Sequence, residues 1–335
     1  MAKLLTNRSV KRGSKIIVTG GAGFIGSNIV RVLNDAGYED IVIVDHLTNN
    51  GKWRNMIDLR FSHYVDKSEF LECIKKNQDH LTLGTEIIIH MGACTNTVEA
   101  DENYLIYNNT IYSKYLFDYC VQKNIRFIYA SSAATYGDGS KGYNDRETNL
   151  RPLTCYGYSK YLFDQWVLRS EKKPAQWVGL KFFNVFGPNE YHKGPMASVV
   201  YHGYNQVIRD GEIRLFKSYR KDYGDGEQKR DFIYVKDVAK VVLFFVENGD
   251  RSGIFNVGTG KARTFLDLAN AVFAALNMKP KIRFIDMPEY LSDKYQYFTE
   301  VDITSLREIG YDEPFWDLEK AVEDYVKNYL EVLKF

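Results

Sequence analysis

The chain has 335 residues, of which 45% are hydrophobic and 26% charged, values that are ordinary for a globular protein of about two domains. A formal net charge of +1 argues against nucleic acid or a membrane as the main partner and favours a small molecule. The four cysteines show no paired spacing, which argues against a disulfide framework and a zinc site, so we expect a reducing compartment and no metal.

Residues 1–14 are polar and precede the first apolar run. They contain basic residues but neither the apolar segment nor the cleavage site of a secretory signal. No run approaches the roughly 18 apolar residues that a membrane span needs. We therefore expect a loose N-terminal extension on a cytoplasmic protein.

The first strong pattern is the stretch KIIVTGGAGFIG at residues 15–26. An apolar run predicts a buried strand, and Gly20, Gly23 and Gly26 follow at once, before the apolar positions take a helical period. Glycines here allow a sharp turn and let a pyrophosphate approach the amides at the helix N-terminus, where the helix dipole favours negative charge. The stretch indicates a dinucleotide site, with a ligand-free glycine turn as the alternative reading.

A second apolar run, residues 41–44, ends in Asp45, roughly 20 residues past the last glycine, where an acid would meet the adenosine ribose of a dinucleotide. This order of elements favours an α/β protein with a Rossmann doubly wound parallel sheet. The cofactor signals conflict. Asp45 favours NAD because it would repel a ribose 2′-phosphate, whereas Lys52 and Lys67 could attract one. By themselves, the two lysines are read more simply as solvated side chains.

Two further segments, residues 61–65 and 86–90, are expected to form a short third strand and a fourth strand. The fourth continues into small residues at its carboxyl end, where the second half of a dinucleotide passes close to the backbone. These residues are Met91, Gly92, Ala93 and Cys94. A long helix follows, which contains Asn108 and Asn109 and ends near Lys123.

The next predicted strand, residues 125–130, ends in Ser131 and Ser132, and Tyr156 and Lys160 follow on one face of a predicted helix. A nearby ammonium favours phenolate and is expected to lower the pKa of Tyr156. Such a phenolate can take a proton from a sugar hydroxyl while hydride leaves the same carbon.

The spacing Y-x-x-x-K occurs three times, which is unsurprising in a chain with 25 tyrosines. Tyr119 with Lys123 closes a helix, and Tyr290 with Lys294 lies in a late loop. Because only the pair that begins at Tyr156 follows a serine at a strand end, it is the candidate for chemistry.

Three motifs, TGGAGFIG, SSAATYG and YGYSK, resemble the extended short-chain dehydrogenases/reductases that act on nucleotide sugars. Longer segments at residues 91–97, 182–199, 229–239 and 253–260 resemble the ADP-L-glycero-D-manno-heptose 6-epimerase family in particular. The resemblance extends from residue 15 to about residue 330. The segment YHKGPMASV discriminates, since the wider superfamily shares the glycine and YxxxK motifs but not this lysine.

The resemblance implies an isomerase that converts ADP-D-glycero-D-manno-heptose to its L-glycero epimer at carbon six, for the heptose of the lipopolysaccharide core. It implies ADP-heptose as substrate and a homopentamer. It also implies NADP rather than NAD despite the acid at the second strand, which reverses the simpler reading of Lys52. Positions that match the family's cofactor site, together with the three glycines, are Phe24, Ile25, Asp45, His46, Lys52, Lys67, Met91, Gly92, Ala93, Cys94, Thr95, Asn108, Lys160 and Val185.

Tyr156 and Lys193 fall on the two acid/base positions of the family, with Ser132 and Lys160 beside them. Transient oxidation is expected, and one fixed phenol cannot reach the substrate oxygen in both of its orientations. The positions that match the family's substrate site are Ser132, Asn184, Lys193, Pro195, His202, Phe216, Arg230 and Tyr295.

The sequence departs from the family in three places. Pro195 stands where a serine is common, His46 where asparagine is common, and the insertion at residues 218–228 is longer than expected. Since Pro195 removes a hydroxyl and a backbone donor, we expect one substrate contact to be affected.

We expect an NADP-binding Rossmann domain at residues 15–183 and a smaller, mainly substrate-binding α/β domain at residues 184–335, with the substrate cleft between them. Two later segments, residues 230–235 and 253–257, are expected to return to the first sheet, and residues 290–298 to form a loop that closes on substrate.

Other functions remain open. A nucleotide-sugar dehydratase would need an acid pair after Ser132, where Ala133 and Ala134 stand, and another nucleotide-sugar epimerase would share most motifs. A non-enzymatic dinucleotide sensor would have no reason to combine Tyr156 with Lys193.

Overall fold

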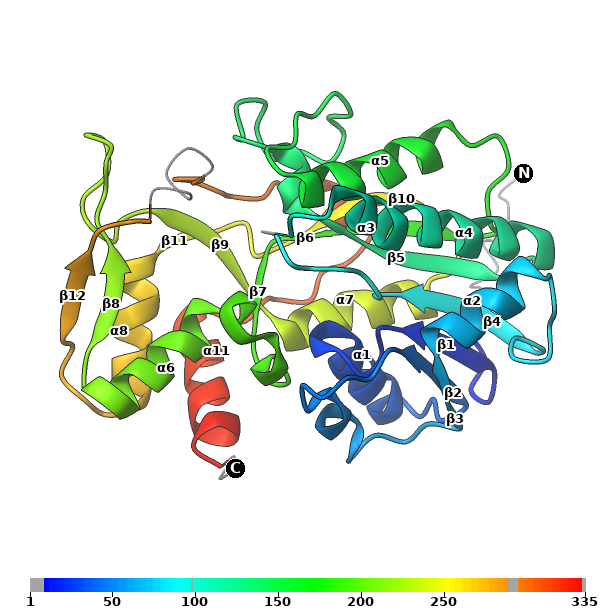
Figure 1. The fold of residues 1–335 in the computed structure, drawn as a ribbon, viewed down its shortest axis with the longest axis horizontal. Helices are drawn as coiled ribbons and strands as arrows, with labels where there is room; N and C mark the ends of the chain where they lie inside the picture. Colours follow the sequence, from blue (N-terminus) through cyan, green and yellow to red (C-terminus); the bar gives the residue numbers. More distant parts are fainter. Residues whose placement is uncertain (1–8, 98, 289–294, 333–335) are drawn as a thin grey trace.

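A seven-stranded sheet forms the centre of the larger part of the molecule in this computed structural model, which describes residues 9–97, 99–288 and 295–332 (Figure 1). Every neighbouring pair of its strands is parallel. In spatial order the strands are β10 (Gly253–Val257), β6 (Trp177–Phe182), β5 (Arg126–Ser132), β4 (Thr85–His90), β1 (Lys15–Thr19), β2 (Ile41–Asp45) and β3 (His63–Asp66).

Helices cover both faces of this sheet, so its strands are buried apolar runs rather than alternating ones. In β1, Ile16 and Val18 pack with α1 (Phe24–Asp35) and α7 (Val235–Glu247). Ile17 points to the other face, which is covered by α2 (Lys67–Lys75), α4 (Tyr112–Lys123) and α5 (Cys155–Arg169) (Figure 1). The predicted doubly wound Rossmann sheet is confirmed.

The strand order reverses at β1, whose neighbours are β2 on one side and β4 on the other. In open parallel sheets the crevice for a ligand lies at the carboxyl ends of strands where the order reverses in this way. That crevice begins here with the glycine-rich turn after β1.

The smaller part of the molecule contains two short sheets and a separate apolar core. One sheet combines β7 (Asn184–Phe186), β9 (Lys229–Tyr234) and β11 (Ala262–Thr264), and the other pairs β8 (Ile213–Phe216) with β12 (Ile282–Ile285). Helices α6 (Val199–Asp210), α8 (Phe265–Ala275) and α11 (Leu318–Tyr325) supply the core around Val200, Val272 and Val322 (Figure 1). The remaining short helices are η1 (Lys52–Met56), α3 (Glu102–Ile106), η2 (Tyr107–Ile111), η3 (Ala133–Tyr136), η4 (Tyr191–Met196), α10 (Thr304–Glu308) and η5 (Val326–Leu330).

One of the two segments expected to return to the large sheet does so. Strand β10 adds to the edge of β6, whereas β9 pairs with β7 and β11 instead. The prediction for residues 230–235 was wrong because β7, which lies outside the large sheet, provides β9 with a parallel partner there.

Part of the expected N-terminal extension lies within the described chain. Val10 is buried, its N–H donates to the Val246 carbonyl at 3.3 Å, and its carbonyl accepts from the Tyr38 hydroxyl at 3.0 Å. Residues 1–8 lie outside the described residues, as does the pair Tyr290 and Lys294.

Candidate active site

The turn after β1 is shaped by glycines that leave no room for a side chain. Gly20 has a φ of +69°, and a Cβ on it would lie 2.7 Å from the Gly92 nitrogen at the end of β4. A Cβ on Gly26 would overlap the Gly20 carbonyl oxygen. Helix α1 therefore starts directly beside the ends of β1 and β4, with its first amides directed at the crevice, an arrangement that suits a pyrophosphate.

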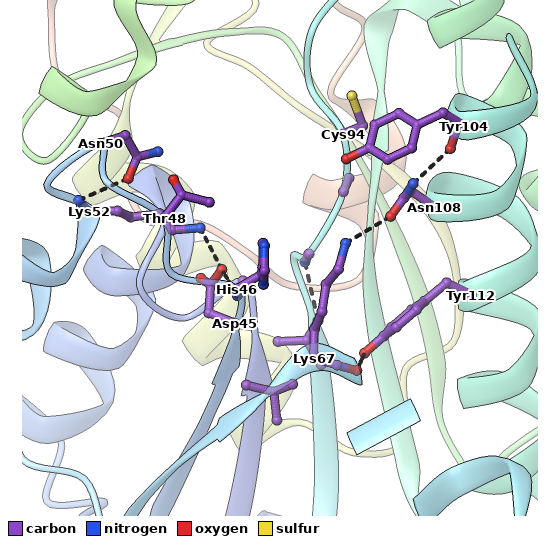
Figure 2. A pocket seen from close by; sticks show the side chains of 15 residues that line it. Asp45, His46, Thr48, Asn50, Lys52, Lys67, Cys94, Tyr104, Asn108 and Tyr112 are labelled. Carbon is purple, nitrogen blue, oxygen red and sulfur yellow. Dashed lines mark hydrogen bonds and ion pairs between the residues drawn. The ribbon is translucent and has the colours of Figure 1, made fainter. Parts of the chain in front are cut away.

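Asp45 ends β2 and is fully engaged. Its Oδ2 accepts a 2.9 Å hydrogen bond from the Ala22 amide in the glycine turn, and its Oδ1 lies 2.6 Å from Nζ of Lys52 (Figure 2). Both side chains are largely buried, at 8% and 15% exposed. The acid therefore faces the crevice as part of an ion pair rather than as a bare carboxylate.

The opposite wall of the same cavity carries the second lysine, as Figure 2 shows. Lys67 donates from Nζ to Oδ1 of Asn108 at 3.0 Å, and Asn108 donates to the Tyr104 carbonyl at 2.8 Å. On the Asp45 side, His46 places Nδ1 3.2 Å from the Asp66 carboxylate.

The long helix expected to end near Lys123 contains a π-helical stretch, η2, between α3 and α4. Such stretches often occur at functional sites because they re-aim side chains. Here Asn109 accepts from the Cys94 amide at 2.8 Å and donates to the Cys94 carbonyl at 3.0 Å, which fixes the chain after β4.

Three adjoining cavities form one groove across the carboxyl ends of the strands. One cavity lies at the Lys67 end of the groove, one beside the glycine turn in the middle, and one around Tyr156 at the other end. Gly20, Asp45 and Lys52 line both the Lys67 cavity and the middle one. Phe24, Met91 and Lys193 line both the middle cavity and the Tyr156 cavity. Every residue predicted for the cofactor lines this groove: Gly20, Gly23, Phe24, Ile25, Gly26, Asp45, His46, Lys52, Lys67, Met91, Gly92, Ala93, Cys94, Thr95, Asn108, Lys160 and Val185. Sequence reasoning missed Thr48, Asn50, Tyr104, Tyr112 and His192. The first four lie among polar or helical residues that carry no motif, whereas His192 stands beside Lys193 in the segment YHKGPMASV, which could have pointed to it.

Tyr156 and Lys160 lie one turn apart on α5, whose N-terminus is capped by the Thr154 hydroxyl. Lys160 donates from Nζ to the Ala130 carbonyl at 3.0 Å. Burial lowers the pKa of Lys160 to about 8, against the opposing effect of the Asp164 carboxylate.

The pKa of Tyr156 does not follow the expectation from its spacing to Lys160. Burial raises the pKa of the phenol, and the group that lowers it is Ser132, through a hydrogen bond. The predicted lowering by the neighbouring ammonium was wrong. Burial destabilises the phenolate by removing it from water, and this effect outweighs the stabilisation that the surrounding groups provide.

Lys193 comes from a different part of the chain but lines the same cavity as Tyr156, a space of about 470 Å³. It lies on η4, and its Nζ is 5.3 Å from the centre of the Phe24 ring. Burial lowers the pKa of this lysine, while the Glu190 carboxylate opposes the shift. Ser132, Lys160 and Asn184 line the cavity as well, so five of the polar side chains predicted for catalysis or substrate binding converge there.

Glu190, which sequence reasoning missed, holds the segment that carries Lys193. Its carboxylate accepts from the Ser198 amide at 2.6 Å, the Ser198 hydroxyl at 2.7 Å and the Gly187 amide at 3.2 Å. A fully buried carboxylate with three donors thus joins the two ends of the segment.

The other predicted substrate residues lie outside the cavity of Tyr156 within the described part of the chain. Phe216, Arg230 and Tyr295 form one cluster, with Cζ of Arg230 5.1 Å from the Tyr295 ring. Arg230 also lies 5.6 Å from the ring of Phe265, which lines the cavity, so the cluster adjoins it. His202 on α6 and the exposed Pro195 do not line the cavity.

The described residues contain no group of three or more His, Cys, Asp or Glu side chains that could hold a metal ion. The four cysteines are free thiols. Within the same residues, no helix has the length and apolar character needed to cross a bilayer.

The groove, the glycine turn and the Tyr156–Lys160 pair together match a known class of enzymes. The model of the NAD dependent epimerase/dehydratase family matches residues 16–258, and the chain belongs to this family. Its cofactor is a nicotinamide dinucleotide. Among solved relatives, the UDP-glucose 4-epimerase of Thermus thermophilus in complex with NAD is 26% identical, has a TM-score of 0.76, and matches over 95% of this chain and 100% of its own.

Within the family, the chain is similar to ADP-L-glycero-D-manno-heptose-6-epimerases, which confirms the narrower resemblance in its sequence. The protein of that name from Fusobacterium nucleatum is 50% identical over 329 residues, covering 94% of this chain and 98% of the relative. The crystal structure of the Helicobacter pylori protein of the same name is 27% identical, has a TM-score of 0.80, and matches over 94% of this chain and 96% of its own.

Proposed function

We propose that this protein converts ADP-D-glycero-D-manno-heptose to ADP-L-glycero-D-manno-heptose at carbon six, with NADP as its cofactor. The observation that carries the proposal is the meeting of Tyr156 and Lys193 in one cavity at the end of a dinucleotide groove. The names of the Fusobacterium and Helicobacter relatives support the same substrate.

The chemistry of carbon six requires a redox route. This carbon carries a hydroxyl but has no adjacent carbonyl to acidify its hydrogen, so direct removal of the proton would face a prohibitive barrier. The dinucleotide supplies reversible hydride acceptance when it is bound. The residues of this chain must then hold the substrate oxygen, move its proton and allow the intermediate ketone to present its other face.

Two acid/base groups suit this task because the oxygen points in different directions in the two epimers. Tyr156 serves one orientation and Lys193 the other, while Ser132 and Asn184 hold the oxygen. Burial shifts the two groups apart: the pKa of the Tyr156 phenol is raised and that of Lys193 is lowered. The phenol is thereby held in its protonated form, able to donate a proton, and a larger share of the amine is neutral and able to accept one, a division of roles seen where environments separate two pKa values.

The preference for NADP rests on the Lys67 cavity of the groove. Lys52 neutralises Asp45, and Lys67 lies on the opposite wall. Two cations around one carboxylate leave a net positive surface for a ribose 2′-phosphate. We also propose a cytoplasmic homo-oligomer, a pentamer by likeness to the family, which light scattering on the purified protein will test.

The test uses ADP-heptose that carries deuterium at carbon six. The label should survive turnover in ordinary water, because the same hydride leaves and returns. Tyr156→Phe and Lys193→Met should each abolish net epimerisation, with opposite epimer preference in any residual half-reaction. Loss of the label to solvent would rule out the hydride route, and near-normal turnover by Lys193→Met would remove that lysine from the chemistry. A 6-deoxy product would instead indicate a dehydratase.

A further inference from the structure

The segment that carries Lys193 rests on the cofactor-binding part of the molecule. Asn28 of α1 donates to the Pro188 carbonyl at 2.9 Å, and Asn189 donates to the Ser27 hydroxyl of the same helix at 2.9 Å. The turn just before Lys193 is therefore attached to the helix that follows the glycine turn.

A single side chain, Asn55 of η1, joins this turn to two other parts of the groove. Its Nδ2 donates to the Ala22 carbonyl in the glycine turn at 3.0 Å and to the Asn189 carbonyl at 3.1 Å. The same nitrogen lies 3.4 Å from Nδ1 of His192, the residue before Lys193.

The state of His192 is consistent with this contact. Burial, together with the charges of Lys52 and Lys193, lowers the pKa of the imidazole to about 4, so the ring is neutral at pH 7. Because both N–H groups of the Asn55 amide already donate to the Ala22 and Asn189 carbonyls, the neutral ring packs against the amide and places no further positive charge beside Lys193.

We propose that Asn55 is a positioning residue that holds the second acid/base group, Lys193, against the glycine turn. The inference rests on the proposed function for the role of Lys193, and goes beyond it by naming what sets the place of that lysine. Lysine has a long, flexible side chain, so its ammonium is placed only as well as its backbone is fixed. Glu190 joins the two ends of this segment, at Gly187 and Ser198, to each other. Asn55 instead attaches the segment to the cofactor groove.

Helix η1 serves two parts of the site. Lys52 begins η1 at one end of the groove, and Asn55 lies three residues later, in contact with the segment of Lys193. The cofactor cavity and the second acid/base group are thus tied together through one short helix.

The first test measures Lys193 itself and needs no turnover. Asn55→Ala and the similarly sized Asn55→Leu remove the amide donors, and Asn34→Ala is the matched control. Asn34 donates to the Tyr38 and Arg60 carbonyls at 2.9 and 2.8 Å elsewhere in the same part of the molecule. Competitive acetylation across a pH series, read by peptide mass spectrometry, gives the pKa of each lysine.

In the wild type and in Asn34→Ala, we expect a depressed pKa for Lys193. In both Asn55 variants it should move back towards the ordinary lysine value, because the released segment lets the ammonium reach water. An unchanged Lys193 pKa in both folded Asn55 variants would overturn the proposal.

The second test measures turnover of ADP-heptose. The Asn55 variants should lose on the order of tenfold in kcat, as expected for a misplaced acid/base group. Their residual single-turnover oxidation should favour the same epimer as Lys193→Met, whereas Asn34→Ala should show no epimer bias. Equal loss for both epimers would contradict the positioning role. A wild type that does not turn over ADP-heptose would refute the proposed function, while the acetylation result would still decide whether Asn55 positions Lys193.

Discussion

Replacing Lys52 by methionine should convert the cofactor preference from NADP towards NAD. The substitution keeps most of the aliphatic stem but removes the ammonium that lies 2.6 Å from the Asp45 carboxylate. Two effects then act on NADP: a phosphate loses a cationic partner, and the unpaired Asp45 repels it. For NAD, the second effect is absent, since a free carboxylate accepts a hydrogen bond from a ribose 2′-hydroxyl.

The expected size follows from the burial of the pair. A hydrogen bond to a charged group contributes about 1.5–3 kcal/mol to binding. The repulsion between the unpaired Asp45 and the 2′-phosphate weakens NADP binding further. NADP affinity should therefore fall by about a hundredfold, where each 1.4 kcal/mol corresponds to a factor of ten. The affinity for NAD should change by less than about threefold, because Asp45 keeps its hydrogen bond from the Ala22 amide and so its place.

The assay is calorimetric titration of cofactor-free protein with each dinucleotide at fixed ionic strength. Lys52→Glu should enlarge the difference, and Asp45→Asn in the Lys52→Met background should restore part of the NADP affinity by removing the repulsion. Equal losses for NADP and NAD would refute the assignment of Lys52 to the 2′-phosphate.

Three further predictions concern the walls of the site. Asp164→Asn should move the alkaline fall of kcat/KM, expected above about pH 8 in the wild type, to lower pH, because the Asp164 carboxylate raises the pKa of Lys160 and the charged lysine predominates only below that pKa; a pH profile that does not move would contradict a need for the ammonium. Gly26→Ala should cost about 1–3 kcal/mol of stability and weaken dinucleotide binding in a titration, since its Cβ would overlap the carbonyl oxygen of Gly20. Glu190→Gln should lower the thermal midpoint, with about 1–3 kcal/mol lost, because an NH₂ group replaces one of the acceptors of three hydrogen bonds; an unchanged midpoint would contradict this account.

The features that the sequence predicted well are those whose parts are close together in the chain. Gly20 to Gly26 form one turn, Asp45 ends the next strand, and Tyr156 and Lys160 share one turn of α5. Short-range sterics and helix periodicity determine these arrangements, so a pattern of residue types is enough to find them.

The features that it did not predict depend on contacts between distant segments. Asn55 and Asn189 are 134 residues apart, and a lone asparagine in a polar stretch carries no signal of such a contact. The same holds for β9, since the choice between two sheets is made by partners far along the chain. The pKa of Tyr156 depends on burial, which only the packed structure reveals.

The late return of β10 to the large sheet has a consequence for synthesis on the ribosome. When residue 183 has emerged, β6 is still an open edge, and α7, which covers one face of the sheet, has not yet been made. At typical translation rates the chain up to residue 257 takes about 4 to 15 s more to appear. During that interval the nascent chain exposes an apolar sheet face and an unpaired edge, both of which favour aggregation. Chaperone dependence should therefore be greatest for nascent chains that end between these two points.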